Sequence, residues 1–371
     1  MKALVVGGTG PTGPFLVNGL LHRGYAVTML HRGTHEIPEI PPAVEHLHAD
    51  PHFRETLDAA LAGRSFDLVI ATYGRIRFVA EALVGKTPRF IGIGGVASYR
   101  GYAVPQANFP TGLKVPTPET APVVTNEEEA RFSYLIAMTE EAVMRVHRQG
   151  HYNATFFRYP YVYGPYQLVP REWCVIRRIL DKRPFIILPD GGLALMTHGY
   201  AANLAQAVLL AVDQPGASAG QIYNCGDEQV LTLHQWVEVI TRTMNYDWET
   251  VCLPNAVAYP ARPFALHETS AHRVMDLAKI KNELGYKDLI PTEEALARTV
   301  QWYLEHPPER GGEIERRLQD PFNYPAEDQL VTIFKESLQR MAAIPFAIES
   351  TRPHPYAHPK APGQQRDHRD R

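Results

Sequence analysis

Cysteine, long apolar runs and excess charge are all scarce in this chain of 371 residues. Its three cysteines, Cys174, Cys225 and Cys252, have the spacing of neither a disulfide framework nor a zinc site, which favours a reducing compartment. No apolar run approaches the ~20 residues that span a bilayer, and we expect no signal peptide. The net charge of −3 argues against nucleic acid as a partner, because a nucleic-acid-binding protein usually carries excess positive charge. We therefore expect a cytoplasmic protein without a membrane span.

Short apolar runs alternate with helical patterns over the first part of the chain. The runs lie at 2–6, 25–30, 66–72, 89–93 and 154–163. Almost continuous apolar strands between helices are typical of buried parallel strands with helices on both faces. We predict an α/β fold whose core is a Rossmann-like, doubly wound parallel sheet with right-handed crossovers.

Three parts are predicted along the chain. Residues 1–165 form the dinucleotide-binding domain, and segments near 196–228 return to it. Residues 166–305 form a smaller α/β substrate domain. Residues 306–371 form a C-terminal extension, which follows a His-Pro-Pro sequence and ends in a Pro/His/Arg tail from His354 that shows no apolar period. We expect this tail to be flexible.

A glycine-rich turn joins the first predicted strand to the first predicted helix. Such a loop allows a tight turn, close approach of the backbone to a pyrophosphate and close helix–strand packing, while the helix N-terminus offers free N–H groups. A turn that binds nothing is the alternative. The predicted dinucleotide-binding residues of the loop are Gly7, Gly10, Pro11, Thr12 and Gly13.

The end of the second predicted strand determines which cofactor fits. NAD-binding proteins usually place a carboxylate there for the ribose 2′-OH, but this strand ends at His31-Arg32-Gly33. Arg32 is suited to pair with a 2′-phosphate, so we favour NADP, with NAD as the alternative. Asp50, after the third predicted strand, is placed to meet the adenine, or else it caps the following helix.

Four stretches carry a resemblance to a known family: the glycine loop, 158–165 (RYPYVYGP), 221–226 (QIYNCG), and 284–286 (LGY) with 301–303 (QWY). Over residues 1 to about 305 the chain resembles extended short-chain dehydrogenases/reductases of the NAD-dependent epimerase/dehydratase type. The resemblance implies a nicotinamide cofactor in the N-terminal domain, a small-molecule substrate in a cleft between the domains, and a homodimer.

The resemblance also implies proton transfer by a Ser or Thr, a Tyr, and a Lys four residues after the Tyr. Tyr134 is the candidate tyrosine, although a shift of one residue would put Ser133 in its place. Met138 stands where the lysine belongs, and residues 115–181 contain no lysine at all. Ser98 is the nearest candidate serine, three residues after the position that the family pattern gives.

His198 is a candidate replacement for the lost acid/base, since an unperturbed histidine titrates near pH ~6.5, and a packed histidine is the alternative. The 16 histidines show no His-Glu-x-x-His spacing, so no metal site is predicted. Aromatic residues and arginines after residue 158 suit a ring-bearing or anionic substrate, unless they simply pack. We predict that Tyr159 binds the cofactor. The predicted substrate-binding residues are Tyr161, Tyr166, Arg171, Tyr200 and His267.

These features favour an NADP(H)-dependent oxidoreductase or epimerase/dehydratase that acts on a hydroxyl or carbonyl of a small, sugar-like substrate. A non-redox lyase or isomerase in the same cleft is one alternative. The other is a non-catalytic protein that senses NADP(H) or contacts RNA, as the chloroplast stem-loop-binding proteins do, which also resemble epimerases.

Overall fold

The computed structural model describes residues 1–34, 37–345 and 362–363. The predicted flexible tail from His354 therefore lies almost entirely outside the described residues. The chain divides into two compact units, Met1–Phe322 and Asn323–Arg371. Among the described helices, none combines the length and apolar character that a bilayer crossing requires.

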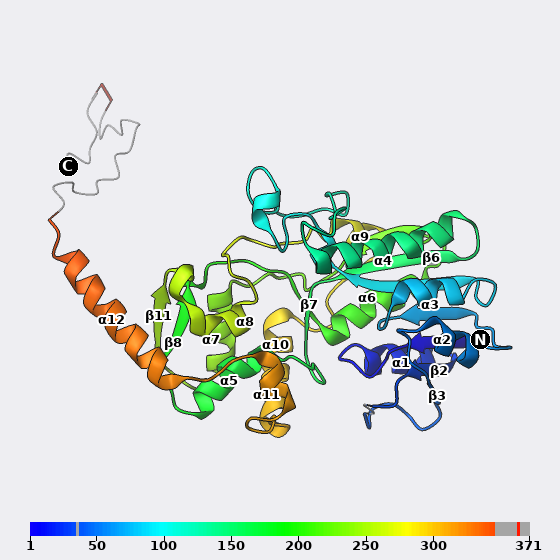
Figure 1. Cartoon of the computed structure of the whole chain (residues 1–371), viewed down its shortest axis with the longest axis horizontal. Helices are drawn as coiled ribbons and strands as arrows, with labels where there is room; N and C mark the ends of the chain where they lie inside the picture. Colours follow the sequence, from blue (N-terminus) through cyan, green and yellow to red (C-terminus); the bar gives the residue numbers. More distant parts are fainter. Residues whose placement is uncertain (35–36, 346–361, 364–371) are drawn as a thin grey trace. The chain divides into compact units, whose positions relative to one another are not determined.

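A sheet of seven parallel strands forms the centre of the first unit, in the order β10-β6-β5-β4-β1-β2-β3 (Figure 1). The strands are β1 (Lys2–Val6), β2 (Ala26–His31), β3 (Glu45–His48), β4 (Leu68–Ala71), β5 (Arg89–Gly95), β6 (Asn153–Tyr159) and β10 (Gln221–Asn224). The chain winds outward from β1 to β3, then crosses back to β4 and continues to β10. This order confirms the predicted doubly wound α/β fold, and it places the topological switch point between β1 and β4.

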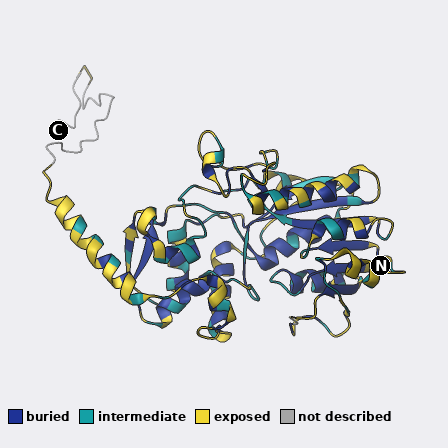
Figure 2. Cartoon of the chain, viewed as in Figure 1, coloured by how far each residue is buried: buried dark blue, intermediate teal, exposed yellow. Residues whose placement is uncertain are grey.

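Both faces of the sheet are covered, which explains the continuous apolar runs. Ala3 and Val5 of β1 belong to one core cluster, and Leu4 and Val6 belong to another on the opposite face. Most of the sheet is accordingly buried (Figure 2). The first cluster includes residues of α1 (Gly13–His22) and α6 (Ala201–Asp213). The second includes residues of α2 (Arg54–Ala60), α3 (Ile76–Ala82) and α4 (Arg131–Arg148).

A second lobe of the same unit is built on two parallel strands, β8 (Phe185–Pro189) and β11 (Glu249–Leu253). Its core also includes residues of α5 (Glu172–Leu180), α7 (Leu233–Thr243) and α10 (Thr292–Glu305). A short parallel pair, β7 (Tyr161–Tyr163) with β9 (His198–Tyr200), lies where the chain passes between the lobes. The chain returns to the main sheet through α6 and β10.

The compact unit extends past residue 306, where the sequence pattern places the start of an extension. Helix α11 (Glu313–Leu318) belongs to it, because the Glu315 carboxylate accepts a hydrogen bond of 2.9 Å from the Trp173 indole and pairs with Arg177. Arg178 and Asp320 form a further buried pair at 2.6 Å. The division falls instead between Phe322 and Asn323. In the second unit, the Asn323 side chain caps α12 (Tyr324–Ala342).

Candidate functional site

The glycine loop between β1 and α1 has the conformation that its sequence predicts. Gly7 and Gly8 adopt positive φ angles of 99° and 91°. A Cβ atom on Gly13 would lie 1.9 Å from the Gly8 carbonyl oxygen, so only glycine allows α1 to approach the loop this closely. A Cβ atom on Gly10 would meet nothing within 4 Å. The Gly10 backbone therefore borders open space, where a ligand has room to approach it.

The loop forms one wall of a pocket of about 370 Å³. Six of the eight predicted cofactor-binding residues line it: Gly7, Gly10, Pro11, Thr12, Arg32 and Tyr159. The first turn of α1 carries no acidic residue, so nothing there neutralises the positive end of the helix dipole. Free N–H groups and a positive dipole end fit the pyrophosphate of a dinucleotide.

The other two predicted cofactor residues do not line this pocket. Gly13 acts through the close packing described above. The Asp50 carboxylate accepts hydrogen bonds from the backbone N–H of His52 at 3.0 Å and from its ring Nδ1 at 2.7 Å. These two bonds hold the carboxylate within its own turn, and it does not cap α2, whose N-cap is Phe53 and carries no side-chain cap. A role of Asp50 at the adenine stays a prediction.

Arg32 is exposed, and its guanidinium carbon lies 5.5 Å from the centroid of the Tyr73 ring, which lines the same pocket. Among the described residues that line the pocket, none is a carboxylate. The described walls thus offer a cation and no anion to the end of the pocket at β2.

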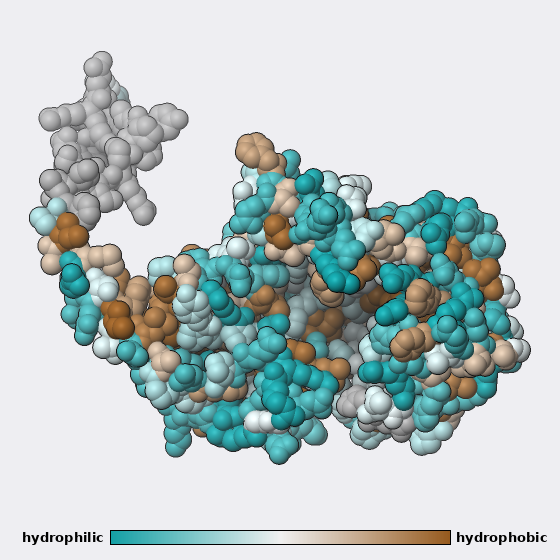
Figure 3. Space-filling view, viewed as in Figure 1, coloured by the Kyte–Doolittle hydropathy of each residue, from teal (hydrophilic) through white to brown (hydrophobic). Residues whose placement is uncertain are grey.

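A larger open cleft, of about 1380 Å³, adjoins this pocket. Thr72, Tyr73, Ile93, Tyr159 and Val162 line both hollows. The cleft is also lined by residues of β5 and α4 and by Tyr161, Arg171 and His267. Figure 3 shows one face of the molecule hollowed between the two lobes of the first unit. A cofactor in the loop pocket would therefore have one end next to the cleft.

The face of helix α4 that lines the cleft does not carry Tyr134. A Tyr-x-x-x-Lys pattern at Tyr134 would need positions 134 and 138 to face the cleft. The lining residues of α4 are Arg131, Phe132, Ser133, Leu135, Ile136 and Thr139. Tyr134 and Met138, four residues apart and so on one face of the helix, are not among them. Ser133 is 1% exposed, and its hydroxyl oxygen has no hydrogen-bond partner. The orientation favours Ser133 over Tyr134 as the residue that faces the cleft.

Ser98 lies at the end of a 3₁₀ turn, η1 (Val96–Ser98), that follows β5. The two residues before it line the cleft, but Ser98 does not, and its buried hydroxyl has no hydrogen-bond partner. His198 lies in β9 and lines a different hollow. The structure therefore does not bring Tyr134, Ser98 and His198 to one site.

The hollow at His198 is a small cavity of about 40 Å³ beside the cleft, and it shares Tyr161, Arg171 and His267 with the cleft. The His198 ring stacks on Trp236 at 4.3 Å, and its Nδ1 lies 2.9 Å from the Met196 carbonyl oxygen. Burial lowers the pKa of His198 to about 4. His198 is thus neutral near pH 7, and because a carbonyl can only accept, its proton lies on Nδ1 and its Nε2 is an acceptor.

Glu172, which the sequence analysis does not single out, is the most unusual group at this cavity. Its side chain is fully buried at the start of α5, and neither carboxyl oxygen has a hydrogen-bond partner. Burial raises its pKa to about 7, an effect that the positive charge of Arg171 only partly offsets. A buried acid without a partner, next to a cavity, is a candidate functional group. The sequence gives no signal for this role, because an acidic residue in the first turn of a helix is common.

His267 also lines both hollows, and burial followed by the positive charges of Arg273 and Arg171 lowers its pKa to about 3. Tyr166 and Tyr200 lie elsewhere. Tyr166 packs at 5.1 Å against Trp302, and Tyr200 is buried at 5.5 Å from Tyr163. For these two tyrosines the structure favours the packing alternative.

Comparison with known proteins supports the resemblance. Residues 107–226 match the model of the NAD dependent epimerase/dehydratase family. The UDP-D-apiose/UDP-D-xylose synthase of Oryza sativa subsp. japonica is 27% identical over 147 residues, which cover 38% of this chain and 37% of that protein. The chloroplast stem-loop binding protein of 41 kDa b of Arabidopsis thaliana is 22% identical over 313 residues, which cover 80% and 77%. The first three curated relatives are matched over only 37–50% of their own length.

Solved structures show the same fold. The UDP-glucose 4-epimerase of Thermotoga maritima, solved with UDP-glucose, superposes with a TM-score of 0.66 at 19% identity and covers 82% of this chain and 99% of that chain. The dTDP-glucose 4,6-dehydratase DesIV of Streptomyces venezuelae, solved with NAD bound, gives 0.63 at 20% identity and covers 82% and 97%. These structures share the fold of this chain, and the match of residues 107–226 to the family model adds a resemblance in sequence to the NAD dependent epimerase/dehydratase family.

Proposed function

We propose, from this family relationship, that the chain is an enzyme that binds a nicotinamide dinucleotide, preferably NADP(H), and oxidises or reduces a hydroxyl- or carbonyl-bearing carbon of a sugar-like substrate. The observation that supports this proposal most directly is that the glycine-loop pocket adjoins the cleft: five residues line both. The fold positions the loop at the carboxyl ends of the strands, where ligands bind in open α/β sheets.

The residues present fit the cofactor. The loop backbone around Gly10 and the N-terminus of α1 would hold the pyrophosphate, and Arg32 would face the ribose end. When bound, the cofactor supplies an acceptor or donor of hydride. The preference for NADP over NAD rests on Arg32 and on the lack of a carboxylate among the described lining residues.

The proton of the reaction needs a carrier other than a Tyr–Lys pair, since no cleft-lining residue of α4 is a tyrosine or a lysine. We assign this role to Glu172, which lines the small cavity beside the cleft and not the cleft itself; Tyr161, Arg171 and His267 line both hollows. A carboxyl group with a pKa of about 7 is present in both forms at neutral pH, so it can take the proton from a substrate hydroxyl during oxidation and return it during reduction. The His198 Nε2 offers a neutral acceptor to orient a substrate hydroxyl.

The position of Arg171 favours a polar or anionic substrate. It lines both the cleft and the cavity, and its buried Nε has no hydrogen-bond partner. With the Tyr161 ring 5.9 Å away, it offers the mixture of cation and aromatic surface that suits a sugar bearing a negatively charged group. UDP- and dTDP-linked sugars are the natural first substrates to test, because the relatives' names point to that class.

The test begins with binding. Purified protein is titrated with NADPH and with NADH, with nicotinamide fluorescence as the readout, and is then incubated with oxidised cofactor and a panel of UDP- and dTDP-sugars. We expect saturable binding, tighter for NADPH, and substrate-dependent cofactor reduction or sugar conversion. Absence of binding for both cofactors would overturn the proposal.

RNA contact is the second candidate function, favoured by the similarity to the stem-loop binding protein over 80% of this chain. The net charge of −3 speaks against it. Binding of a labelled stem-loop RNA at near-physiological salt, unaffected by saturating NADPH, would favour this function over the first.

Two further expectations remain proposals. A homodimer would use the exposed face of α4 that carries Met138, whereas Met144 of the same helix is buried within the chain. A cytoplasmic location is supported by three free cysteines, of which Cys174 and Cys225 are buried. Light scattering on the purified protein tests the first, and localisation of the tagged protein in its cell of origin tests the second.

A further inference from the structure

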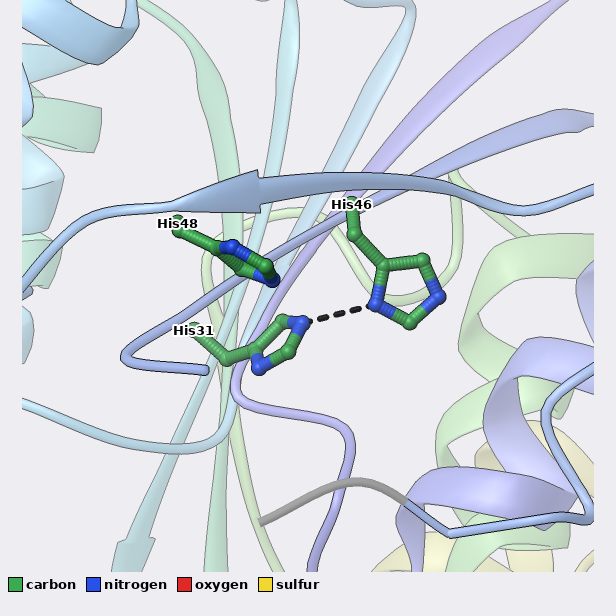
Figure 4. Close-up of side chains that lie close together, drawn as sticks. All are labelled: His31, His46 and His48. Atoms are coloured by element: carbon green, nitrogen blue, oxygen red, sulfur yellow. Dashed lines mark hydrogen bonds between the residues drawn. The ribbon is translucent and has the colours of Figure 1, made fainter. Parts of the chain in front are cut away.

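Three imidazole rings face one another near the edge of the central sheet (Figure 4). His46 and His48 lie two residues apart on the edge strand β3 and therefore on one face of the sheet. The parallel register pairs His31, the last residue of β2, with His48. One ring nitrogen from each histidine lies within 4.8 Å of those of the other two.

Two hydrogen bonds describe the inner part of this cluster. The Gly33 backbone N–H donates to Nδ1 of His31 at 3.2 Å, so neutral His31 carries its proton on Nε2. That nitrogen lies 2.8 Å from Nδ1 of His46 and donates to it. The rings of His31 and His48 meet edge to face at 5.0 Å. The cluster thus keeps two imidazole nitrogens, one from His31 and one from His46, pointed at each other.

Neutral imidazole is a preferred ligand of zinc and its neighbours in the first transition row. Zn–N bonds of ~2.0–2.1 Å separate tetrahedral ligand atoms by roughly 3.3 Å, a distance between the 2.8 Å and the 4.8 Å found here. Small ring rotations would suffice. On binding the metal, His31 would move its proton to Nδ1. It would exchange its hydrogen bonds with Gly33 and His46 for a bond to the metal.

The three histidines differ in their exposure to solvent. His31 is 4% exposed, His46 is half-buried and His48 is exposed. Gly33 leaves room for the outermost ring, since a Cβ atom there would lie 3.3 Å from two carbon atoms of His48. An ion can therefore enter from the His48 side and be held against a rigid inner ligand.

We propose that His31, His46 and His48 form a binding site for one divalent transition-metal ion of the zinc type, with three protein ligands and at least one position left open. Sequence spacing alone does not show this site, because its third ligand comes from another strand. Metal-ion binding here does not depend on the proposed enzymatic function.

The test uses the full chain without a polyhistidine tag, freed of metal by a chelator, and titrated with Co²⁺ and with Zn²⁺. Calorimetry gives the stoichiometry, and the visible spectrum of bound Co²⁺ reports its ligands. We expect one ion per chain and imidazole nitrogens at ~2.0–2.1 Å in X-ray absorption of the zinc form. His48→Ala and His46→Ala should each weaken binding by more than the ~10–100-fold that loss of an outer-shell partner costs.

His22→Ala and His151→Ala, which remove two exposed histidines elsewhere, are the matched controls and should bind as the parent does. Because His48 is exposed, its alanine variant keeps the test valid if His46→Ala does not fold, and circular dichroism checks both. Failure of the parent to bind either ion, or equal affinity in the parent and in His48→Ala, would overturn the proposal.

Discussion

The Arg158 guanidinium on β6 donates two hydrogen bonds, of 2.7 and 2.6 Å, to the Glu140 carboxylate on α4. Both side chains are nearly buried, at 4% and 9% exposure. Arg158 also lies 4.5 Å above the Tyr99 ring. The arginine of the 158–165 run, which carries much of the family resemblance, therefore holds in place the helix that lines the cleft.

Removing one partner of this pair should be costly. In Glu140→Ala the buried guanidinium loses its counter-charge, and we expect a loss of about 3–5 kcal/mol in the free energy of unfolding, measured in urea. Glu141→Ala is the matched control, because Glu141 pairs with Arg148 on the exposed side of the same helix and should cost less than about 1 kcal/mol. Equal losses would contradict a special role for the buried pair.

Two glycines of the loop should separate folding from binding. Gly13→Ala forces a Cβ atom against the Gly8 carbonyl, so it should lower the thermal midpoint and cofactor binding together. Gly10→Ala meets nothing in the protein, so it should leave the midpoint unchanged and weaken NADPH binding by occupying the ligand's space. Gly216→Ala, also in open space and far from the loop in sequence, should change neither. Tight NADPH binding by Gly10→Ala would remove the loop from the cofactor site.

Arg32→Gln should discriminate between the two cofactors. A charge-assisted hydrogen bond to a 2′-phosphate contributes about 1.5–3 kcal/mol, so NADPH should bind roughly 10–150-fold more weakly while NADH changes little. Fluorescence titrations with both cofactors measure the ratio. If both affinities fall equally, Arg32 is not the residue that selects NADP.

Glu172 should make stability depend on pH in a definite direction. The folded protein keeps a proton on Glu172 between its ordinary pKa of 4.5 and its raised pKa of about 7, a range in which the unfolded chain has lost it. The contribution of this group to the free energy of unfolding therefore falls as pH rises through that range. Glu172→Gln lacks this proton, so its stability relative to the parent should increase by up to about 3 kcal/mol from pH 4.5 to above pH 7. Urea unfolding at a series of pH values checks this, and a constant difference would show that Glu172 titrates normally.

Measurements of kcat should distinguish the role of Glu172 from that of Tyr134. Once a substrate is found, Glu172→Gln should lower kcat by ~10²–10⁴, the usual contribution of a general acid/base. Tyr134→Phe should leave kcat unchanged, because Tyr134 lines neither the cleft nor the small cavity at Glu172 and His198. The opposite result would restore Tyr134 to the chemistry and remove Glu172.

The sheet and the glycine loop could be predicted because their signals are local. Parallel strands buried on both faces read as continuous apolar runs, and the loop's glycines are needed by the backbone itself. The phase of α4 could not be predicted, since the side that faces the cleft depends on contacts such as Glu140 with Arg158, eighteen residues apart. The burial of the Glu172 carboxyl could not be predicted either, because acids in first helical turns are usually exposed.

The face that α4 presents to the cleft has a consequence for redesign. Phe132 and Ile136 lie one helical turn apart, and both line the cleft. Ile136 reaches over the end of β5, where its side chain would lie 3.6 Å from a Cβ atom on Gly94. Phe132 and Ile136 thus occupy, with apolar side chains, two cleft-facing positions with the four-residue spacing of the Tyr-x-x-x-Lys pattern. Placing Tyr and Lys at these two positions would give the cleft a tyrosine–lysine pair without a change in the backbone.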